Sequence, residues 1–320
     1  MAEAIALGAS VRPWTSPNPW VGCVLVPDGG GPAFEGATEP PGGRHAEAVA
    51  LDLAGEDARG ATAYVTLEPC AHHGRTPPCA DALVEAGVRR VVVATEDPDP
   101  RVDGQGIARL RAAGIPVELG VGRSEAEGLL SPYLKHRRSG RPWVVLKLAA
   151  TLDGRTAAPD GTSRWITGPA ARADAHALRA ESDAVAVGAG TVRADDPSLT
   201  VRDAGGRDPL RVVLGRLPPG ARVAPALEHT GPLDDLLDRL GRRDVLQLLV
   251  EGGPRVAHAF HSARLVDRYV VYLAPALLGG DDGLPLLAGA GAPTMGEVWR
   301  GRLAGVRELG GDVRIDVLAR

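Results

Sequence analysis

The sequence predicts two consecutive α/β domains of comparable size, with a boundary near Gly140. Three observations lead to this fold class. Short apolar runs rich in β-branched residues alternate with helical patterns, as expected for helices that pack on a sheet. The length of 320 residues allows one or two domains. The alternation also restarts after a basic, glycine-containing segment that ends at Gly140.

In the first half, four short β-branched runs predict strands, and helical patterns lie between them. Three of the predicted helices end in glycine, the residue that commonly terminates a helix. The fourth leads into a basic connector. The predicted strands are residues 20–26, 61–67, 89–95 and 115–121, and the predicted helices are residues 45–55, 79–87, 104–114 and the part of 123–140 that precedes the connector.

The second half repeats this alternation. Its first helix begins with a proline, which suits the first turn of a helix. No internal repeat or long low-complexity tract interrupts the pattern. The predicted strands are residues 142–150, 183–190, 210–215, 245–253, 266–275 and 311–320, and the predicted helices are residues 168–182, 234–243 and 254–265.

Composition narrows the classes of function. The net charge is -4 with acids and bases interspersed, which disfavours nucleic acid as a partner because such proteins usually carry a basic surplus or stripe. No apolar run reaches the roughly 18 residues of a membrane helix, and the first ten residues do not resemble a signal peptide. Three cysteines are too few for a disulfide framework. We therefore expect a cytoplasmic protein with no nucleic-acid or membrane partner.

His45, Cys70 and Cys79 form a set of zinc-type ligands. A catalytic zinc takes thiolate and imidazole ligands and keeps its fourth position for water. His45 and Cys79 both fall at predicted helix starts, where the helix dipole favours a thiolate. Glu47, two residues after the histidine, can move a proton without being a ligand. This pattern matches the zinc deaminases, in which a glutamate acts as general acid and base, although eight residues separate these cysteines where that pattern has two.

The same residues also have a purely structural explanation. H-x-E occurs by chance, a lone histidine is usually structural, and buried cysteines are often inert, as we expect of Cys23. However, Cys70 and Cys79 lie in polar sequence rich in proline and glycine. A small apolar residue has no packing reason to be there, so the zinc interpretation is favoured.

The chain resembles the family of bifunctional riboflavin-biosynthesis deaminase/reductases over nearly its whole length. The long interval between the cysteines is particular to that family among cytidine-deaminase-like proteins. The segments that carry the resemblance are "TSPNPWVGCVLV", "RHAEAVAL", "GATAYVTLEPCAHHGRTPPC", "KLAATLDGRTA", "SRWITG", "ARADAHALRAESDAVAVGAGTVRADDPSLTVR" and "LLVEGGP", in this order.

The resemblance implies a cytidine-deaminase-like three-layer domain over residues 1–140 and a dihydrofolate-reductase-like α/β domain over residues 141–320. The first would use one zinc ion per chain to remove the 2-amino group of 2,5-diamino-6-(5-phosphoribosylamino)pyrimidin-4(3H)-one as ammonia. The second would use NADPH to reduce the ribosyl chain of the resulting aminouracil. The resemblance also implies a homo-oligomer formed through the reductase domain.

For the deaminase, the resemblance implies that Glu47 is catalytic and that Asn18 contacts the pyrimidine. Arg75 would meet the substrate phosphate, for which a guanidinium is well shaped. Without the resemblance, Asn18 is equally well explained as a turn residue between two prolines. Thr38 stands where the family has a histidine, so one expected contact is in doubt.

For the reductase, no G-x-G-x-x-G follows the first strand, so a Rossmann-type site has little support. A strand followed by two glycines and a helix that opens at a proline offers a better phosphate site, although most such joints are only tight connections. In the family this stretch contacts NADP, here Gly253, Pro254, Arg255, Val256, Ala257, His258 and Ala259.

The remaining family positions are spread over the second domain. Taken singly, each has a bland explanation: an exposed strand end for Lys147, a helix-face arginine for Arg179, a loop aspartate for Asp195, or a buried tryptophan for Trp165. The implied substrate contacts are Lys147, Ser163, Arg179, Leu199, Arg202 and Glu251, and the implied cofactor contacts are Ala149, Trp165, Thr191 and Asp195.

The reductase half also departs from the family pattern. Gly215 and Arg216 replace an expected Asp-Ser, and a strand–helix–strand stretch between Arg222 and Leu233 is expected to be missing. An alternative function is therefore a deaminase whose reductase domain is truncated, weak or inactive. A nucleic-acid deaminase is a further alternative, which the acidic balance, the cysteine spacing and the second domain disfavour.

Overall fold

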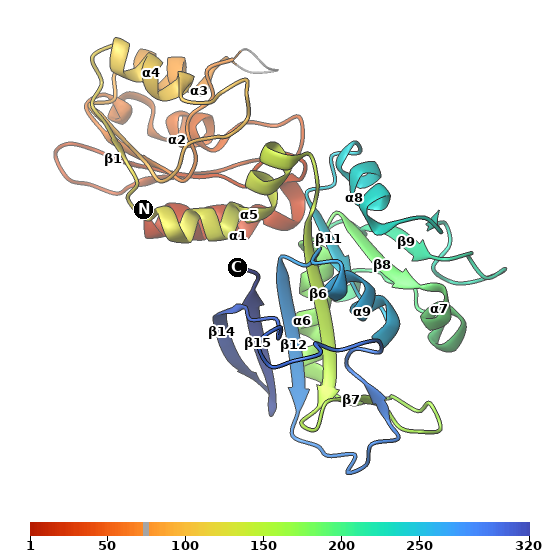
Figure 1. Cartoon of the computed structure of the whole chain (residues 1–320). Helices are drawn as coiled ribbons and strands as arrows, with labels where there is room; N and C mark the ends of the chain where they lie inside the picture. Colours follow the sequence, from red (N-terminus) through yellow and green to blue (C-terminus); the bar gives the residue numbers. More distant parts are fainter. Residues whose placement is uncertain (73–76) are drawn as a thin grey trace. The chain divides into compact units, whose positions relative to one another are not determined.

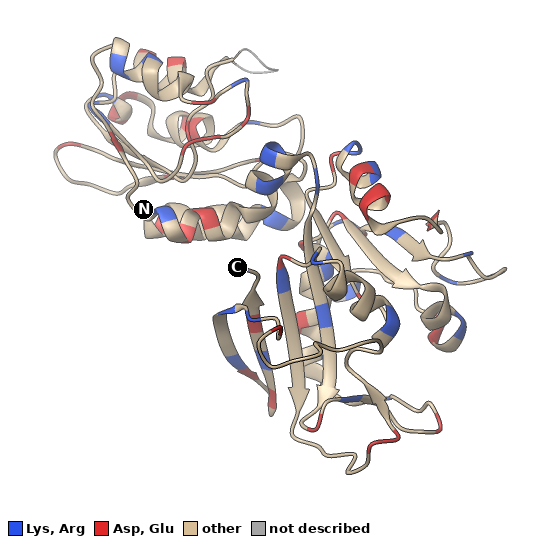
Figure 2. Cartoon of the chain, in the orientation of Figure 1, with Lys and Arg blue, Asp and Glu red and all other residues tan. Residues whose placement is uncertain are grey.

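The computed structural model describes residues 1–72 and 77–320, apart from the side chain of residue 203. The chain divides into two compact units, Met1–Gly140 and Arg141–Arg320 (Figure 1). Acidic and basic residues are interspersed in both units (Figure 2). None of the helices in these ranges is long and apolar enough to cross a membrane.

The first unit is built on a five-stranded mixed sheet. Its strands follow the order β2-β1-β3-β4-β5. β1 runs antiparallel to β2 and β3, and β3, β4 and β5 are parallel to one another. The strands are β1 Gly22–Val26, β2 Phe34–Ala37, β3 Thr62–Val65, β4 Arg90–Val93 and β5 Val117–Leu119.

Helices cover both faces of this sheet, which makes three layers. α1 and α5 lie side by side on one face, and α2, α3 and α4 lie on the other (Figure 1). Small residues let α1 approach β1 closely, because a Cβ at Gly8 would lie 2.6 Å from the carbonyl oxygen of Trp20. The helices are α1 Ala2–Thr15, α2 Ala46–Ala54, α3 Cys79–Glu85, α4 Gln105–Ala112 and α5 Arg123–Ser139, with a 3-10 turn at Gly55–Ala58.

The structure corrects the sequence analysis at the end of this unit. The predicted basic connector is helical, and α5 continues to Ser139. Gly140 ends it in the left-handed conformation, with φ 68°, and donates its N–H to the His136 carbonyl. Basic side chains in the last turn favour the helix because they face the negative end of its dipole. α1 and β2 were not predicted from the sequence.

The second unit is built on an eight-stranded sheet in the order β10-β9-β8-β11-β6-β12-β15-β14. The strands from β10 to β12 are parallel to one another, and β15 runs antiparallel to both of its neighbours, β12 and β14. A separate pair joins β7 Arg155–Ala157 to β13 Leu284–Pro285. The main strands are β6 Trp143–Thr151, β8 Ala184–Gly188, β9 Leu210–Leu214, β10 Leu227–His229, β11 Gln247–Val250, β12 Arg268–Ala274, β14 Arg302–Leu309 and β15 Asp312–Leu318.

Two apolar cores lie on the two faces of this sheet. Val145, Leu249 and Tyr272 pack with α6 Pro169–Ala180 and α7 Ala189–Asp195 on one face. On the other face, the core contains Leu236 of α8 Leu233–Gly241 and Phe260 of α9 Pro254–Ser262. The predicted strand at residues 183–190 ends at Gly188, where α7 begins.

The stretch between Arg222 and Leu233 holds a single short strand in the structure. β10, Leu227–His229, pairs in parallel with β9 and forms the edge of the sheet. α8 begins at Leu233. The sheet is thus continuous from β10 to β14 despite the brevity of this stretch.

Candidate active sites

Three potential metal ligands meet at the starts of two helices in the first unit. His45 is the N-cap of α2, Cys79 is the first residue of α3, and Cys70 lies in the loop after β3. The His45 Nδ1 atom lies 3.6 Å from the Cys70 sulfur and 3.3 Å from the Cys79 sulfur. All the donor atoms lie within 4.8 Å of one another.

This geometry fits a zinc ion. Tetrahedral zinc with ordinary bond lengths places a nitrogen and a sulfur ligand about 3.6 Å apart. The two nitrogen–sulfur distances are close to that value. Hydrogen bonds from the Cys79 thiol, the His45 ring and the Cys79 backbone N–H to the Cys70 sulfur lower the pKa of the Cys70 thiol, which favours the thiolate that a metal needs. Cys79 is the first residue of α3, as predicted, but it is only 2% exposed and therefore well packed, which the polar sequence around it did not indicate.

Glu47 lies in the first turn of α2, beside the metal ligands. Its side chain is buried, and burial is the main reason why the pKa of its carboxyl is raised to about 7. A carboxyl that gains and loses a proton near neutrality is suited to general acid and base work. Cys23, by contrast, is a fully buried core residue of β1, as predicted.

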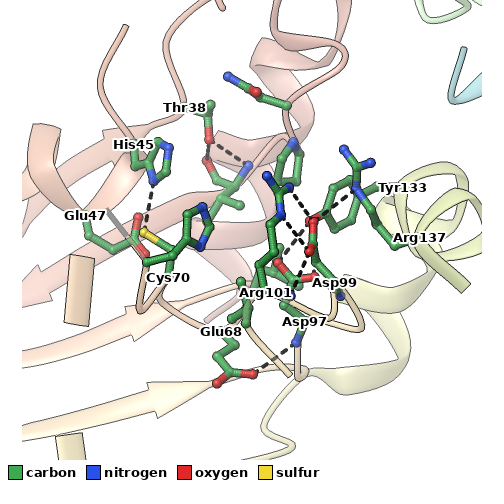
Figure 3. Close-up of a pocket in the computed structure, with 16 residues that line it drawn as sticks. Thr38, His45, Glu47, Glu68, Cys70, Asp97, Asp99, Arg101, Tyr133 and Arg137 are labelled. Carbon is green, nitrogen blue, oxygen red and sulfur yellow. Dashed lines mark hydrogen bonds and ion pairs between the residues drawn. The ribbon is translucent and has the colours of Figure 1, made fainter. Parts of the chain in front are cut away.

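A cavity of about 200 Å³ opens in front of these groups. His45, Glu47 and Cys70 lie at one end of it, and Asn18 and Thr38 line its wall (Figure 3). The backbone of Asn18 closes a turn by donating to the Thr15 carbonyl, so this residue is both a turn residue and a part of the cavity. Arg75, the predicted phosphate ligand, lies outside the described residues.

Thr38 has a structural role of its own. Its hydroxyl accepts the Val21 N–H at 3.0 Å and donates to the Val21 carbonyl, which ties the end of β2 to the start of β1. The side chain is 4% exposed, and its polar atom is already engaged. In place of the family histidine, Thr38 lines the cavity with a short side chain whose hydroxyl is hydrogen-bonded to the backbone.

The far end of the cavity is formed by residues that were not predicted from the sequence. Asp97 and Asp99 follow β4, and Tyr133 and Arg137 come from α5 (Figure 3). The Tyr133 hydroxyl lies 3.1 and 3.0 Å from the two oxygens of Asp97, and burial raises the pKa of Asp97 to about 6. Arg101 donates to Asp99 twice from its guanidinium and once from its backbone N–H, and these bonds lower the pKa of that carboxyl to about 2.

Glu68 connects this far wall to the metal ligands. It precedes Pro69 and Cys70 in the chain, and its carboxylate accepts the backbone N–H groups of Asp97, Gly104 and Ile107 at 3.1 to 3.2 Å. At Gly106, a Cβ atom would overlap the carbonyl oxygen of Pro69. The loop that carries Cys70 is therefore fastened directly to the loop that carries Asp97. The alternation of acidic residues and prolines after β4, "EDPDP", was the one sequence signal that could have indicated this far wall.

In the second unit, the carboxyl ends of the parallel strands gather the predicted cofactor residues. Ligands of open α/β sheets bind at this edge. β8 ends at Gly188, where α7 begins, and β11 leads through Gly252 and Gly253 into α9. Thr191 of α7 lies against Gly253, because a Cβ there would be 3.2 Å from its hydroxyl oxygen. The two helix starts thus adjoin.

Pro254 opens α9 with Gly253 as its N-cap, as predicted. Backbone N–H groups in such a first turn are free to bind phosphate. The predicted contact stretch is not uniform, however. Ala257 is 0% exposed in the core, and the His258 ring bonds to the Ala290 carbonyl at 2.9 Å. Arg255 and Ala259 are exposed.

The predicted substrate residues include a buried ion pair. Arg179 of α6 donates from Nε and Nη2 to the two oxygens of Glu251 at 2.5 and 2.9 Å, and from Nη1 to the Thr200 carbonyl. Leu199 precedes Thr200 in the chain, so the bond to the Thr200 carbonyl places Leu199 near this ion pair. Burial tends to raise the pKa of Glu251, but the Arg179 guanidinium outweighs it and the pKa is lowered.

Lys147 lies in the middle of β6 and is partly buried, so the strand-end explanation is wrong. The register of β6 and β11 aligns Leu146 with Val250, which puts Lys147 next to Glu251. Burial lowers the pKa of the Lys147 ammonium. Ala149 lies two residues further along β6, on the same face.

Trp165 is 67% exposed, so the buried-tryptophan explanation is also wrong. The Arg172 guanidinium stacks 4.5 Å from its ring. Asp195 is the last residue of α7, not a loop residue, and its carbonyl accepts from Arg164. Ser163 lies two residues before Trp165 in the chain, and Arg202 is exposed in a short 3-10 turn.

Comparison with known proteins gives consistent results for both units. The family model "RibD C-terminal domain" matches residues 142–315, and the model "cytidine and deoxycytidylate deaminase zinc-binding region" matches residues 1–95. Riboflavin biosynthesis protein RibD of Escherichia coli K12 is 45% identical over 324 residues, covering 88% of each chain. The RibD protein of Mycobacterium tuberculosis H37Rv is 43% identical over 333 residues, covering 100% of this chain and 96% of its own.

Solved structures agree with this comparison. One form of Acinetobacter baumannii RibD superposes with a TM-score of 0.92 at 41% identity, covering 100% of this chain and 97% of its own. A diaminohydroxyphosphoribosylaminopyrimidine deaminase/5-amino-6-(5-phosphoribosylamino)uracil reductase from Thermotoga maritima gives 0.92 at 34% identity with the same coverage.

Proposed function

The chain belongs to the RibD family of riboflavin biosynthesis proteins, and from this premise we propose how its residues share two reactions. It is a bifunctional enzyme, with a zinc-dependent deaminase and an NADPH-dependent reductase. We assign the deaminase to residues 1–140 and the reductase to residues 141–320. The first acts on diaminohydroxyphosphoribosylaminopyrimidine, and the second on 5-amino-6-(5-phosphoribosylamino)uracil.

His45, Cys70 and Cys79 hold the zinc in this proposal. Zinc bound by such ligands supplies a water molecule that is activated at neutral pH. Glu47 would take a proton from the water that attacks the ring carbon and pass it to the adjacent ring nitrogen. It would then carry the proton of the new hydroxyl to the amino group, which leaves as ammonia when the carbon–nitrogen bond breaks and the carbonyl forms. The raised pKa of Glu47 supports this double role. Asn18 orients the pyrimidine from the cavity wall, and Arg75 meets the phosphate.

The reductase residues divide into two groups. Lys147, Arg179 and Glu251 form the substrate side, joined by Leu199, Ser163 and Arg202. The first turn of α9 from Gly253 to Val256 binds a phosphate of NADPH through backbone N–H groups, with Thr191 beside it. Ala149, Trp165 and Asp195 complete the cofactor side. In the rest of the predicted stretch, Ala257 supports the site from the core.

The observation that carries the deaminase proposal is the cluster of one imidazole and two thiols within 4.8 Å beside a buried carboxyl. For the reductase, the continuous sheet and the match of the second family model favour activity over the deaminase-only alternative. We also propose a cytoplasmic homo-oligomer formed through the reductase unit. The exposed Leu303 and Val306 of edge strand β14 support that interface.

One assay tests both activities. The purified protein is incubated with the phosphoribosyl diaminopyrimidine, with and without NADPH. Ammonia release alone without NADPH, followed by NADPH oxidation when it is added, is the expected result. Ammonia release with no NADPH oxidation would leave a deaminase only. No ammonia release, together with deamination of a nucleic acid, would overturn the proposed substrate class.

A further inference from the structure

A buried tyrosine faces Lys147 in the reductase unit. Tyr272 of β12 is 1% exposed, and the Lys147 ammonium lies 5.8 Å from the centre of its ring. The register pairs Lys147 with Val270 and Ala149 with Tyr272, so the two side chains are diagonal neighbours on one face of the sheet. A cation within about 6 Å of an aromatic ring is attracted by its electron-rich face.

The position of the tyrosine ring is fixed from behind. Its hydroxyl donates to the Asp174 carboxylate of α6 at 2.6 Å. Arg314 of β15 donates to the same carboxylate oxygen at 2.5 Å and holds Asp316 with two further hydrogen bonds. Arg314 and Asp316 are 4% and 6% exposed. A satisfied polar network of this kind is rigid, and it joins α6 and β15 to β12 behind Lys147.

Lys147 has few other sources of stabilisation. Within the ranges that the structure describes, it forms no ion pair. The charge of its neighbour Glu251, which forms two hydrogen bonds with Arg179, acts to raise the pKa of the ammonium, and the charge of Arg179 acts to lower it. The charged and titratable groups that bear on Lys147 and on the Tyr272 ring are Glu251 just after β11, Arg179, His176 and Asp174 on α6, and Arg314 on β15, whose guanidinium lies 6.0 Å from the centre of the same ring. Burial disfavours the ammonium, and the ring of Tyr272 opposes that effect.

Stability alone does not account for this arrangement. A buried ion network can often be replaced by apolar residues at little or no cost in stability. Here the network ends on an aromatic ring that faces the lysine of the reductase site. We propose that Tyr272 is a positioning residue for the reductase, which holds the Lys147 ammonium charged and directed beside Glu251. This inference rests on the proposed reductase site.

The direct test measures the pKa of Lys147 without turnover. The holoprotein is labelled competitively with acetic anhydride across a pH series, and the modified peptide is quantified by mass spectrometry. Tyr272→Leu is expected to lower the pKa of Lys147 by about half to one pH unit, the amount that corresponds to a cation–π contact. Tyr272→Phe keeps the ring face and should leave the pKa within about 0.2 of the wild-type value.

The matched controls lie on the same strand. Tyr269 of β12 faces the opposite core and bonds to His261, so Tyr269→Leu and Tyr269→Phe remove comparable groups away from Lys147. An unchanged pKa in Tyr272→Leu, or an equal change in Tyr269→Leu, would overturn the proposal. Tyr272→Met, which fills more of the space, replaces the leucine variant if that variant does not fold.

A kinetic measurement separates this proposal from the function on which it rests. The alkaline limb of reductase kcat on deaminated substrate should move down in pH with the labelling result in Tyr272→Leu, while deamination by the same sample is unchanged. A wild-type protein that oxidises no NADPH would refute the proposed reductase. A limb that stays in place while the pKa of Lys147 moves would show that Tyr272 does not position the reactive group.

Discussion

Replacing Asp97 by asparagine is expected to stabilise the first unit at pH 8 more than at pH 5. In the wild-type protein burial raises the pKa of this carboxyl from 3.8 to about 6. The folded state therefore binds more protons than the unfolded state between these values, and stability falls as the pH rises through that window. Asparagine has the same shape and carries no charge, so this dependence disappears.

The size of the effect follows from the two pKa values. Each pKa unit corresponds to about 1.4 kcal/mol, so the fully ionised carboxylate costs about 3 kcal/mol at pH 8. At pH 5 the same linkage gives about 1.6 kcal/mol. The loss of hydrogen-bond geometry toward Tyr133 and the Asp99 N–H is common to both pH values. The difference between them, about 1.4 kcal/mol, isolates the charge.

The assay compares wild type and variant in urea with saturating zinc at each pH. Hydrogen exchange of the peptide that spans β3, Thr62–Val65, reports the stability of the first unit separately from that of the second. A gain that is equal at both pH values, or no gain at either, would refute the reasoning. Deamination should fall in the variant, because Asp97 lines the cavity.

Three further predictions concern the proposed sites. Cys70→Ser should reduce zinc from about one ion per chain to a small fraction, measured by metal analysis after desalting, with reductase activity as the control. Glu47→Gln should keep zinc and lose about 10²- to 10⁴-fold of deamination, and retained deamination would exclude it as the proton carrier. The short stretch before α8 predicts a high KM for NADPH and a weak preference for NADPH over NADH. Arg216→Ala should weaken that preference further. If the ratio of kcat/KM for NADPH to that for NADH did not change in the variant, Arg216 would not contact the 2′-phosphate.

The metal ligands could be predicted from the sequence because their chemistry is rare in this chain. Only three cysteines occur, and two of them stand at positions with no packing role evident from the pattern. The helices at residues 45–55 and 79–87 were also predicted, so the placement of His45 and Cys79 at helix starts followed from local sequence. The structure confirms both helix starts within a residue.

The far wall of the cavity could not be predicted in the same way. Tyr133 lies 36 residues from Asp97 along the chain, and acidic and basic residues are too common to single out a pair. β2, "FEGA", lacks β-branched residues, and β14 is exposed along most of its length, so neither has the alternation that marks a strand. α1 packs through Ala4 and Gly8, small residues that give little apolar signal.

The three backbone N–H groups bound by Glu68 make the two ends of the deaminase cavity thermodynamically dependent on each other. A metal that ordered the Cys70 loop would order the Asp97 loop as well, through this carboxylate, and substrate binding would then cost less conformational entropy. By linkage the effect is reciprocal: whatever factor zinc adds to nucleotide affinity, the nucleotide adds to zinc affinity. A chain that has released its metal should therefore bind substrate more weakly, and substrate should slow the escape of the metal to a chelator.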